Sequence, residues 1–301
     1  MLRNLLRSML LISLLLSACG GASGLGSHKL KVVATFSVLG DLAAIVGGDE
    51  IQLTTLAGPG VDSHTFSPTA ADTAAVADAD IVFENGLQFE PWLDALYTSS
   101  GSKAARVVVS KGITPLTVED NSQTVTDPHI WHDVTYAVQA VRAIRDELVS
   151  ADAKNATAYK SNAGVFIARL QELDTWVYVQ VNKLPEDRRK LVTTHDSFGY
   201  LAKRYGFQII GTVLPASTEG ASPSAQQVAA LVEAVKAAGV PAIFGENVTN
   251  NSLLQQVADE AGVKAVTTLY TDALGPAGSG GETYEKMMRS NVLTIVAALL
   301  K

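Results

Sequence analysis

The sequence predicts an α/β fold in which two α/β halves flank one long central helix. Strand-like, β-branched runs alternate with helical runs in both halves of the chain, as in βαβ units around a parallel-type sheet. Residues 152–184 form a single long helical pattern between the two halves. A chain of 301 residues also exceeds the usual size of one hydrophobic core. Two lobes are therefore expected.

The first half, residues 29–151, contains four strand-like runs and the helices between them. Residues 114–128 are expected to be a polar loop that ends at Asp127-Pro128. A helix follows from near His129 to about Val149, and Asp127 is its candidate N-cap, because a carboxylate oxygen can accept a bond from a free N–H group of the first turn. The strands are expected at 30–35, 51–56, 80–84 and 105–110, and the earlier helices at 38–46, 69–77 and 91–97.

The long helical pattern, residues 152–184, is expected to link the halves and to stop at Leu184-Pro185, because proline cannot continue a helix. The second half, residues 185–301, then repeats the alternation. One of its helices begins at Pro223, with Ser222 as the expected cap. The apolar residues of the long helix are Val165, Ile167, Leu170, Leu173 and Val177. The later strands are expected at 190–194, 207–212, 242–245 and 264–268, and the helices at 197–205, 223–238, 251–261 and 282–300.

The first residues have the three parts of a secretory signal. Arg3 and Arg7 precede a short apolar run, residues 9–16, and the run ends in Leu-Ser-Ala before Cys19. This run is too short to cross a bilayer as a helix. The segment resembles a bacterial lipobox, which implies that residues 1–18 are removed and that Cys19 carries a lipid. Residues 19–28 then form a lipid-anchored, flexible tether.

The composition excludes several classes of protein. Cys19 is the only cysteine, so the fold has no internal disulfide, and lipidation accounts for a thiol that would otherwise be unexplained. The formal net charge is −7, and an acidic chain without a basic stripe argues against nucleic-acid binding. No other segment is long and apolar enough to be transmembrane. We expect an extracytoplasmic protein.

Four of the five histidines lie where strands end or helices begin, and His28 lies in the tether. Ligands of open α/β sheets bind at the carboxyl ends of strands, and imidazole is the commonest side chain that binds transition metals. Asp272 follows the last strand and is a candidate fourth ligand. Each residue alone is more often structural, and spacing does not join them. The four histidines are His64, His129, His132 and His195.

At these positions the sequence resembles the substrate-binding proteins of bacterial zinc and manganese ABC importers, the ZnuA/TroA type. The resemblance spans nearly all of residues 29–301, and the motifs occur in the order that the family has. The matching segments are 32–37 (VVATFS), 60–69 (GVDSHTFSPT), 127–131 (DPHIW), 194–206 (THDSFGYLAKRYG) and 270–274 (YTDAL).

The resemblance implies two lobes joined by one rigid helix, with a metal ion in the cleft between them. It implies His64 and His129 as ligands from the first lobe, and His195 and Asp272 as ligands from the second. His132 departs from the family pattern, which has an aliphatic or aromatic residue there. It is expected to be an auxiliary ligand, a donor to a ligand, or a surface histidine.

The implied ligand set also guides the choice of metal. Manganese members of the family tend to have a glutamate in place of His195, whereas three imidazoles and one carboxylate favour four-coordinate Zn²⁺. The His-rich loop of many zinc members is absent from residues 114–128. We expect Zn²⁺ as the transported ion, with Mn²⁺ or iron as alternatives.

The expected function is metal delivery to the membrane permease of an ABC transporter by a monomer held at the bilayer through Cys19. Catalysis is not expected, because the chain has no HExxH motif, GxSxG elbow or P-loop. Two alternatives of other classes stay open. One is a metallohydrolase with three ligands and an activated water, and the other is a surface adhesin.

Overall fold

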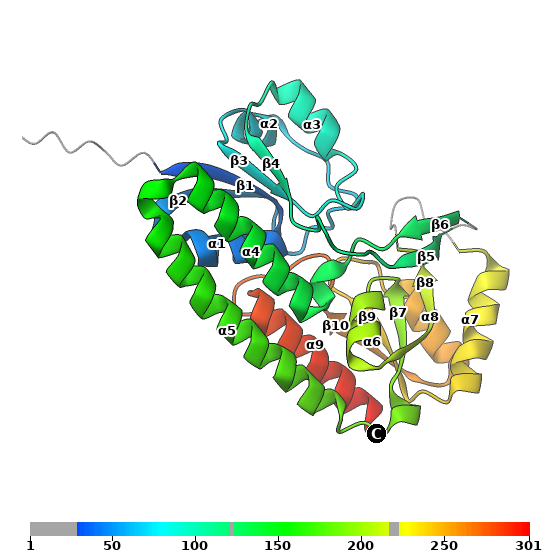
Figure 1. The fold of residues 1–301 in the computed structure, drawn as a ribbon. Coiled ribbons are helices and arrows are strands. Elements are labelled where there is room, and N and C mark those ends of the chain that lie inside the picture. Colours follow the sequence, from blue (N-terminus) through cyan, green and yellow to red (C-terminus); the bar gives the residue numbers. More distant parts are fainter. Residues whose placement is uncertain (1–28, 121–122, 217–222) are drawn as a thin grey trace, which may run out of the picture.

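The computed structural model describes residues 29–120, 123–216 and 223–301. Two α/β lobes lie along one side of the long helix α5 (Ala156–Val181), and the last helix, α9 (Tyr284–Leu299), packs beside it (Figure 1). Helix α5 lies inside the predicted linking segment, residues 152–184, after a short 3₁₀ turn at Ala153–Asn155. The predicted fold class is confirmed.

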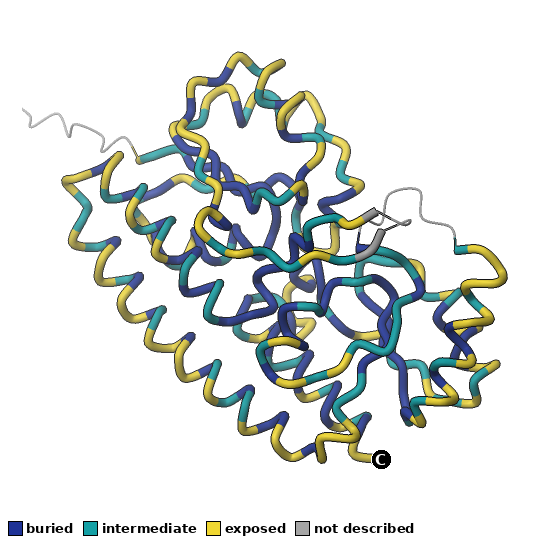
Figure 2. Tube along the Cα trace, turned by 45° about the vertical axis from the view of Figure 1, so that its right-hand side comes forward, coloured by how far each residue is buried: buried dark blue, intermediate teal, exposed yellow. Residues whose placement is uncertain are grey.

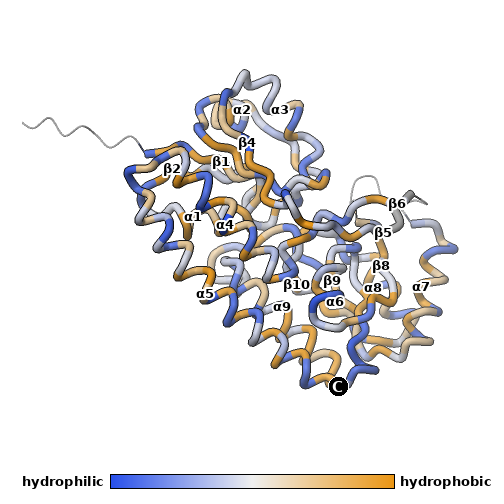
Figure 3. The backbone as a smooth tube through the Cα atoms, viewed as in Figure 1, coloured by the Kyte–Doolittle hydropathy of each residue, from blue (hydrophilic) through white to orange (hydrophobic). Residues whose placement is uncertain are grey.

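The N-terminal lobe is built on a four-stranded parallel sheet with the order β2-β1-β3-β4. Strand β1 carries the buried run Val32–Phe36 and is largely hydrophobic in Figure 3, as expected for a parallel sheet covered by helices. The strands are β1 (Leu30–Phe36), β2 (Ile51–Ala57), β3 (Ile81–Glu84) and β4 (Ala105–Val108), and the helices are α1 (Ser37–Gly47), α2 (Ala70–Ala77) and α3 (Leu93–Ser100).

The C-terminal lobe repeats this architecture with the strand order β10-β9-β7-β8, again parallel. Because all four strands run the same way, their carboxyl ends lie at one edge of the sheet. The strands are β7 (Lys190–His195), β8 (Gln208–Leu214), β9 (Ala242–Glu246) and β10 (Lys264–Leu269), and the helices are α6 (Gly199–Tyr205), α7 (Ala225–Ala238) and α8 (Ser252–Ala261).

One large apolar core continues from the first lobe into the second. It includes Phe36 of β1, Phe166 and Leu170 of α5, and Tyr284 and Leu299 of α9, all buried. Figure 2 shows that α5 turns buried residues toward the lobes and exposed residues outward. The apolar stripe repeats at the spacing of three and four residues that one face of a helix requires. The stripe consists of Phe166, Leu170, Leu173 and Val177.

Val165, one of the apolar residues of this helix, is 62% exposed. Its neighbour Phe166 occupies the inward position, because adjacent residues on a helix point in different directions. The apolar character of Val165 therefore contributes little to the core.

Three predicted details of the local structure were wrong. The polar loop at 114–128 contains an antiparallel hairpin, β5 (Thr117–Asp120) and β6 (Gln123–Thr126), because its β-branched residues favour strands. A 3₁₀ turn, Ile130–His132, follows His129, and helix α4 (Val134–Ala151) starts later with Asp133 as its cap, so Asp127 does not cap it.

The expected helix start at Pro223, with Ser222 as its cap, was also wrong: helix α7 begins at Ala225 and is capped by Ser224 in a capping box with Gln227, and Ser222 itself lies outside the described residues. The leader, the tether, Cys19 and His28 also lie outside them, so the predictions about them stay predictions. Among the residues that the structure describes, no helix is both long and apolar enough to cross a membrane.

Candidate metal centre

Four predicted side chains meet between the two lobes. One potential ligand atom from each of His64, His129, His195 and Asp272 lies within 4.8 Å of the others, and all four residues are buried. His64 lies in the loop after β2, His129 precedes the 3₁₀ turn, His195 ends β7, and Asp272 follows β10. Strand ends from both sheets thus contribute to one site, as ligand sites of open α/β sheets do.

The loop after β2 directs His64 into the site. Gly60 has a φ of +75°, a conformation that glycine adopts without a steric cost. The Asp62 carboxylate then accepts a hydrogen bond of 2.8 Å from the backbone N–H of His64, and the Trp92 indole donates to the carbonyl of Ser63 at 2.7 Å. These two contacts fix both polar groups of the peptide between Ser63 and His64, directly before the His64 side chain.

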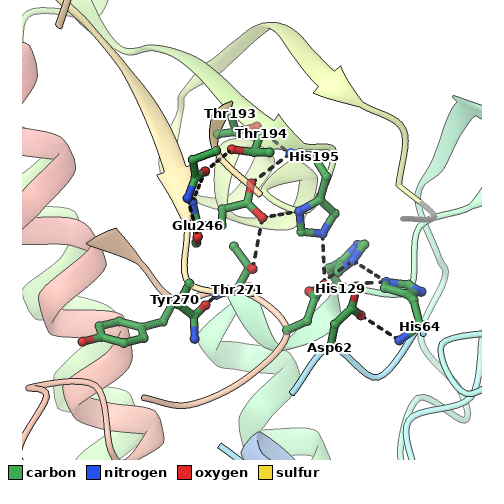
Figure 4. A network of polar contacts seen from close by, with 12 residues as sticks. Asp62, His64, His129, Thr193, Thr194, His195, Glu246, Tyr270 and Thr271 are labelled. Carbon is green, nitrogen blue, oxygen red and sulfur yellow. Dashed lines mark hydrogen bonds and ion pairs between the residues drawn. The ribbon is translucent and has the colours of Figure 1, made fainter. Parts of the chain in front are cut away.

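Buried carboxylates orient the other two imidazole rings. Asp127 Oδ1 lies 2.7 Å from His129 Nδ1 and accepts a bond of 2.9 Å from the backbone N–H of the same histidine. Glu246, the last residue of β9, contacts His195 Nδ1 and also accepts from the His195 backbone N–H at 2.9 Å. A carboxylate at Nδ1 holds the proton there and leaves Nε2 free as a ligand. Figure 4 shows the three rings turned toward one another, with Glu246 behind His195.

Sequence reasoning missed both partners. It took Asp127 for a helix cap, whereas its position two residues before His129 places it against that ring. It did not single out Glu246, which lies 51 residues from His195 and reaches it only because β9 and β7 are neighbours in the sheet. The sequence signal for Glu246 was its position as an acidic residue at the end of an otherwise apolar strand.

Several distances between donor atoms are close to those around one tetrahedral ion, within a group that spans at most 4.8 Å. His64 Nε2 and His129 Nε2 are 3.3 Å apart, Asp272 Oδ1 lies 3.4 Å from His129 Nε2, and Asp272 Oδ2 lies 3.1 Å from His195 Nε2 and 3.7 Å from His64 Nε2. Donors bonded to zinc at about 2.0–2.2 Å would lie about 3.3–3.6 Å apart in a tetrahedron. The side chains present therefore fit a small divalent ion.

Several donor atoms of the site have no hydrogen-bond partner. Within the described residues, His195 Nε2 and both carboxylate oxygens of Asp272 are buried and accept or donate none. Native proteins rarely leave such atoms unpaired, and each one needs an explanation such as an ion. Their unpaired state is consistent with donors that a cation would satisfy.

The charges of the site also suit a cation. Burial lowers the pKa of His64 to about 3, against the opposing charge of Asp272, so this imidazole is neutral. Burial alone would raise the pKa of Asp272, but the facing His195 and His129 hold it below its usual range. Burial likewise lowers the pKa of His195, but Glu246 and then Asp272 outweigh it and raise that pKa well above the ordinary value. A metal ion at this site must displace the proton on His195.

His132 lies outside the four-residue group. The expectation of a surface histidine was wrong, because the residue is fully buried and its ring lies 4.6 Å from that of Phe198, centroid to centroid. Neither ring nitrogen has a hydrogen-bond partner among the residues that the structure describes, and burial lowers the pKa of His132 to about 3. His132 is thus a neutral ring packed next to the site.

Comparison with known proteins identifies the family. Residues 32–298 match the family described as "Zinc-uptake complex component A periplasmic". The chain belongs to this family. That match covers both lobes and all four residues of the candidate metal centre.

Three similar proteins are named for three different metals. The chain is 36% identical over 294 residues, and 96% of either chain, to the manganese-binding lipoprotein MntA of Halalkalibacterium halodurans. It is 30% identical over 270 residues to the iron-binding protein YfeA of Yersinia pestis, covering 89% of this chain and 86% of YfeA. The structure superposes on the periplasmic zinc-binding protein TroA of Treponema pallidum with a TM-score of 0.84 at 30% identity, covering 90% of this chain and 99% of TroA. These relatives are named as binding proteins, and the family is one of substrate-binding proteins rather than enzymes.

Proposed function

We propose that this protein captures Zn²⁺ with His64, His129, His195 and Asp272 and delivers it to the permease of an ABC importer. In this proposal a lipid on Cys19 holds the protein at the outer face of the membrane. The observation that carries the proposal is the buried group of four potential donors, whose ligand atoms lie within 4.8 Å of one another and whose Asp272 oxygens accept no hydrogen bond from the described residues. The names of the relatives support the transport role.

Binding is favoured over catalysis because the protein supplies all four ligands. Catalytic zinc sites keep a position open for water or substrate, whereas a site with four protein ligands has none. The four side chains are also buried, with exposures of 4% for His64 and 0% for the other three. A closed, buried site suits an ion that is carried intact.

The donor types support Zn²⁺ as the cargo. Three imidazole nitrogens and one carboxylate form a borderline set that suits zinc, and Mn²⁺ prefers more oxygen ligands and a higher coordination number. Mn²⁺ is the second candidate, because MntA proteins of two organisms, 36% and 31% identical to this chain, are named manganese-binding. Asp272 offers two unpaired oxygens, and bidentate binding through both would raise the coordination number.

Competitive titration of the full chain, purified in detergent, tests the proposal. We expect one Zn²⁺ per chain, bound much more tightly than Mn²⁺. His195→Ala removes a ligand and should weaken Zn²⁺ binding by at least about 100-fold, since the site is left with three donors and with a buried Glu246 that has lost its imidazole partner. His132→Phe is the matched control, because it replaces another buried histidine near the site and keeps an aromatic ring against Phe198. This variant should bind like the wild type.

The outcomes separate the candidates. Preferential Mn²⁺ binding by the wild type would make manganese the cargo, and no tight binding of any divalent ion would refute a metal-binding function. His195→Glu adds an oxygen donor in place of a nitrogen and is expected to shift the preference toward Mn²⁺. An unchanged preference would show that the ligand types do not set the selectivity.

A further inference from the structure

Asp272 differs from the other ligands in how it is held. Asp127 and Glu246 orient the rings of His129 and His195, whereas the Asp272 oxygens contact only the ring nitrogens of the three candidate histidines, and no further donor in the described structure bonds to them. The direction of this side chain therefore depends on the backbone that carries it, residues 271–274. Any group that fixes this backbone also fixes a ligand.

The backbone on both sides of Asp272 is bonded to the N-terminal lobe. The Trp131 indole donates to the Thr271 carbonyl at 2.9 Å. Beyond Asp272, the backbone N–H of Leu274 donates to Ser37 Oγ at 2.9 Å, and the Leu274 carbonyl accepts from the backbone N–H of Gly60 at 2.9 Å. Asp272 follows the last strand of the C-terminal sheet, yet these three bonds attach it to the other lobe.

From the C-terminal lobe, Glu246 accepts a bond of 3.2 Å from the Thr271 hydroxyl, and Asn247 bonds to the backbone of the same segment. The side chain of Asn247 accepts from the Thr271 N–H at 3.3 Å and donates to the Ala273 carbonyl at 3.2 Å. Both distances are long for such bonds. The shorter bonds to the segment thus come from the N-terminal lobe.

We propose that Ser37 is a positioning residue for the metal ligand Asp272. Ser37 is the first residue of α1, directly after β1, and its side chain is buried. Its hydroxyl oxygen fixes the Leu274 N–H two residues beyond the ligand. This role rests on the proposed metal-binding function and deepens it, because a residue outside the site then determines where one ligand lies.

The Leu274 peptide also links two ligand loops. Gly60, which bonds to the Leu274 carbonyl, lies in the turn that leads to His64. Ser37 and Gly60 therefore hold Leu274 from both of its backbone groups and set how far Asp272 lies from His64, at 3.7 Å between Oδ2 and Nε2. A segment ordered before the ion arrives loses less entropy on binding, which strengthens affinity.

Ser37→Ala tests the proposal in the full chain purified in detergent. The variant leaves the buried Leu274 N–H without an acceptor, which frees the segment. Zn²⁺ dissociation, measured by stopped flow against excess chelator, is expected to become about tenfold faster, the effect of losing one buried hydrogen bond. Hydrogen exchange of the Leu274 amide in the metal-free protein is expected to speed up as well.

Ser102→Ala is the matched control. Ser102 is a buried serine in the same lobe whose Oγ also accepts a backbone N–H, that of Ala104 at 3.1 Å. Ser102→Ala therefore removes a similar buried hydrogen bond at a position away from the site. We expect neither the Zn²⁺ dissociation rate nor the Leu274 exchange rate to change in this variant.

The two readouts separate the possible failures. An unchanged hydrogen-exchange rate of the Leu274 amide in Ser37→Ala would refute the claim that Ser37 holds the Leu274 backbone. Faster exchange with a Zn²⁺ dissociation rate equal to that of Ser102→Ala would refute the positioning of Asp272, although the metal-binding function would stand. A wild type that binds no metal tightly would refute the proposed function and, with it, the positioning role.

Discussion

Glu246→Gln is expected to weaken Zn²⁺ binding and to change its dependence on pH. Glu246 is buried and contacts His195 Nδ1 through Oε2, which also accepts a bond of 3.2 Å from the Thr271 hydroxyl. Its Oε1 accepts from the His195 backbone at 2.9 Å. Glutamine keeps the shape and one acceptor oxygen but removes the charge. The substitution therefore isolates the electrostatic contribution of Glu246 to the ligand.

The magnitude follows from two effects. Loss of a carboxylate behind a ligating imidazole costs about 10–100-fold in metal affinity. The second effect concerns the proton. Burial lowers the pKa of His195, but Glu246 and Asp272 raise it well above the ordinary value, so below that raised pKa the metal must displace a proton. Wild-type affinity should then rise about tenfold per pH unit until the pH reaches the pKa of His195.

Without the Glu246 charge the pKa of His195 falls, so the rise in affinity should level off at a lower pH. Chelator competition from about pH 5.5 to 8.5, within the range where histidines titrate, measures both effects. Glu84→Gln is the control, since Glu84 is also a buried glutamate at the end of a strand but pairs with Arg106. Equal affinity and equal pH dependence in Glu246→Gln and the wild type would show that Glu246 does not act on His195.

Three further predictions concern stability. Leu170→Ala is expected to lower the free energy of unfolding by about 2–5 kcal/mol, and Val165→Ala, at an exposed position, to change it by less than about 0.5 kcal/mol, both by urea denaturation. Glu90→Ala leaves a buried threonine hydroxyl and two backbone N–H groups unpaired, so a loss of about 2–3 kcal/mol is expected in the same assay. Tyr200→Phe removes a hydroxyl that donates to the Asp127 carbonyl at 2.8 Å. We expect the free energy of unfolding to fall by about 1–2 kcal/mol and Zn²⁺ binding to weaken in a chelator titration. Unchanged Zn²⁺ affinity would show that this hydrogen bond does not affect the metal site.

The fold could be predicted because its elements are encoded locally. Runs such as residues 30–36 are β-branched and apolar, and helices such as α1 end at glycines, so strand and helix signals alternate clearly along the chain. The hairpin at 117–126 was missed because its two strands are short and mixed with polar residues. The exposure of Val165 could not be predicted, because an apolar side chain does not by itself say which face of a helix it occupies.

The site could be predicted only in part. Each candidate ligand was visible as a histidine or aspartate beside a strand end or a helix start, but the four candidates lie 65, 66 and 77 residues apart along the chain. Residues at such distances meet through the order of strands in the sheets, which local patterns do not contain. The carboxylate partner Glu246 shows this most clearly, because it reaches His195 only across the β9–β7 pair.

The continuity of the core leads to a prediction about metal release. Tyr284 of α9 donates through its hydroxyl to the Trp131 carbonyl at 2.8 Å and through its backbone N–H to Asp41 at 2.8 Å. Both bonds, like the apolar core, join the C-terminal part of the chain to the first lobe. A wide rotation of the lobes would break all of these contacts at once, whereas a local shift of residues 271–274 breaks only a few hydrogen bonds. We therefore expect equal radii of gyration for the metal-free and Zn²⁺-bound protein in X-ray scattering, and a clearly larger metal-free radius would contradict release by local movement.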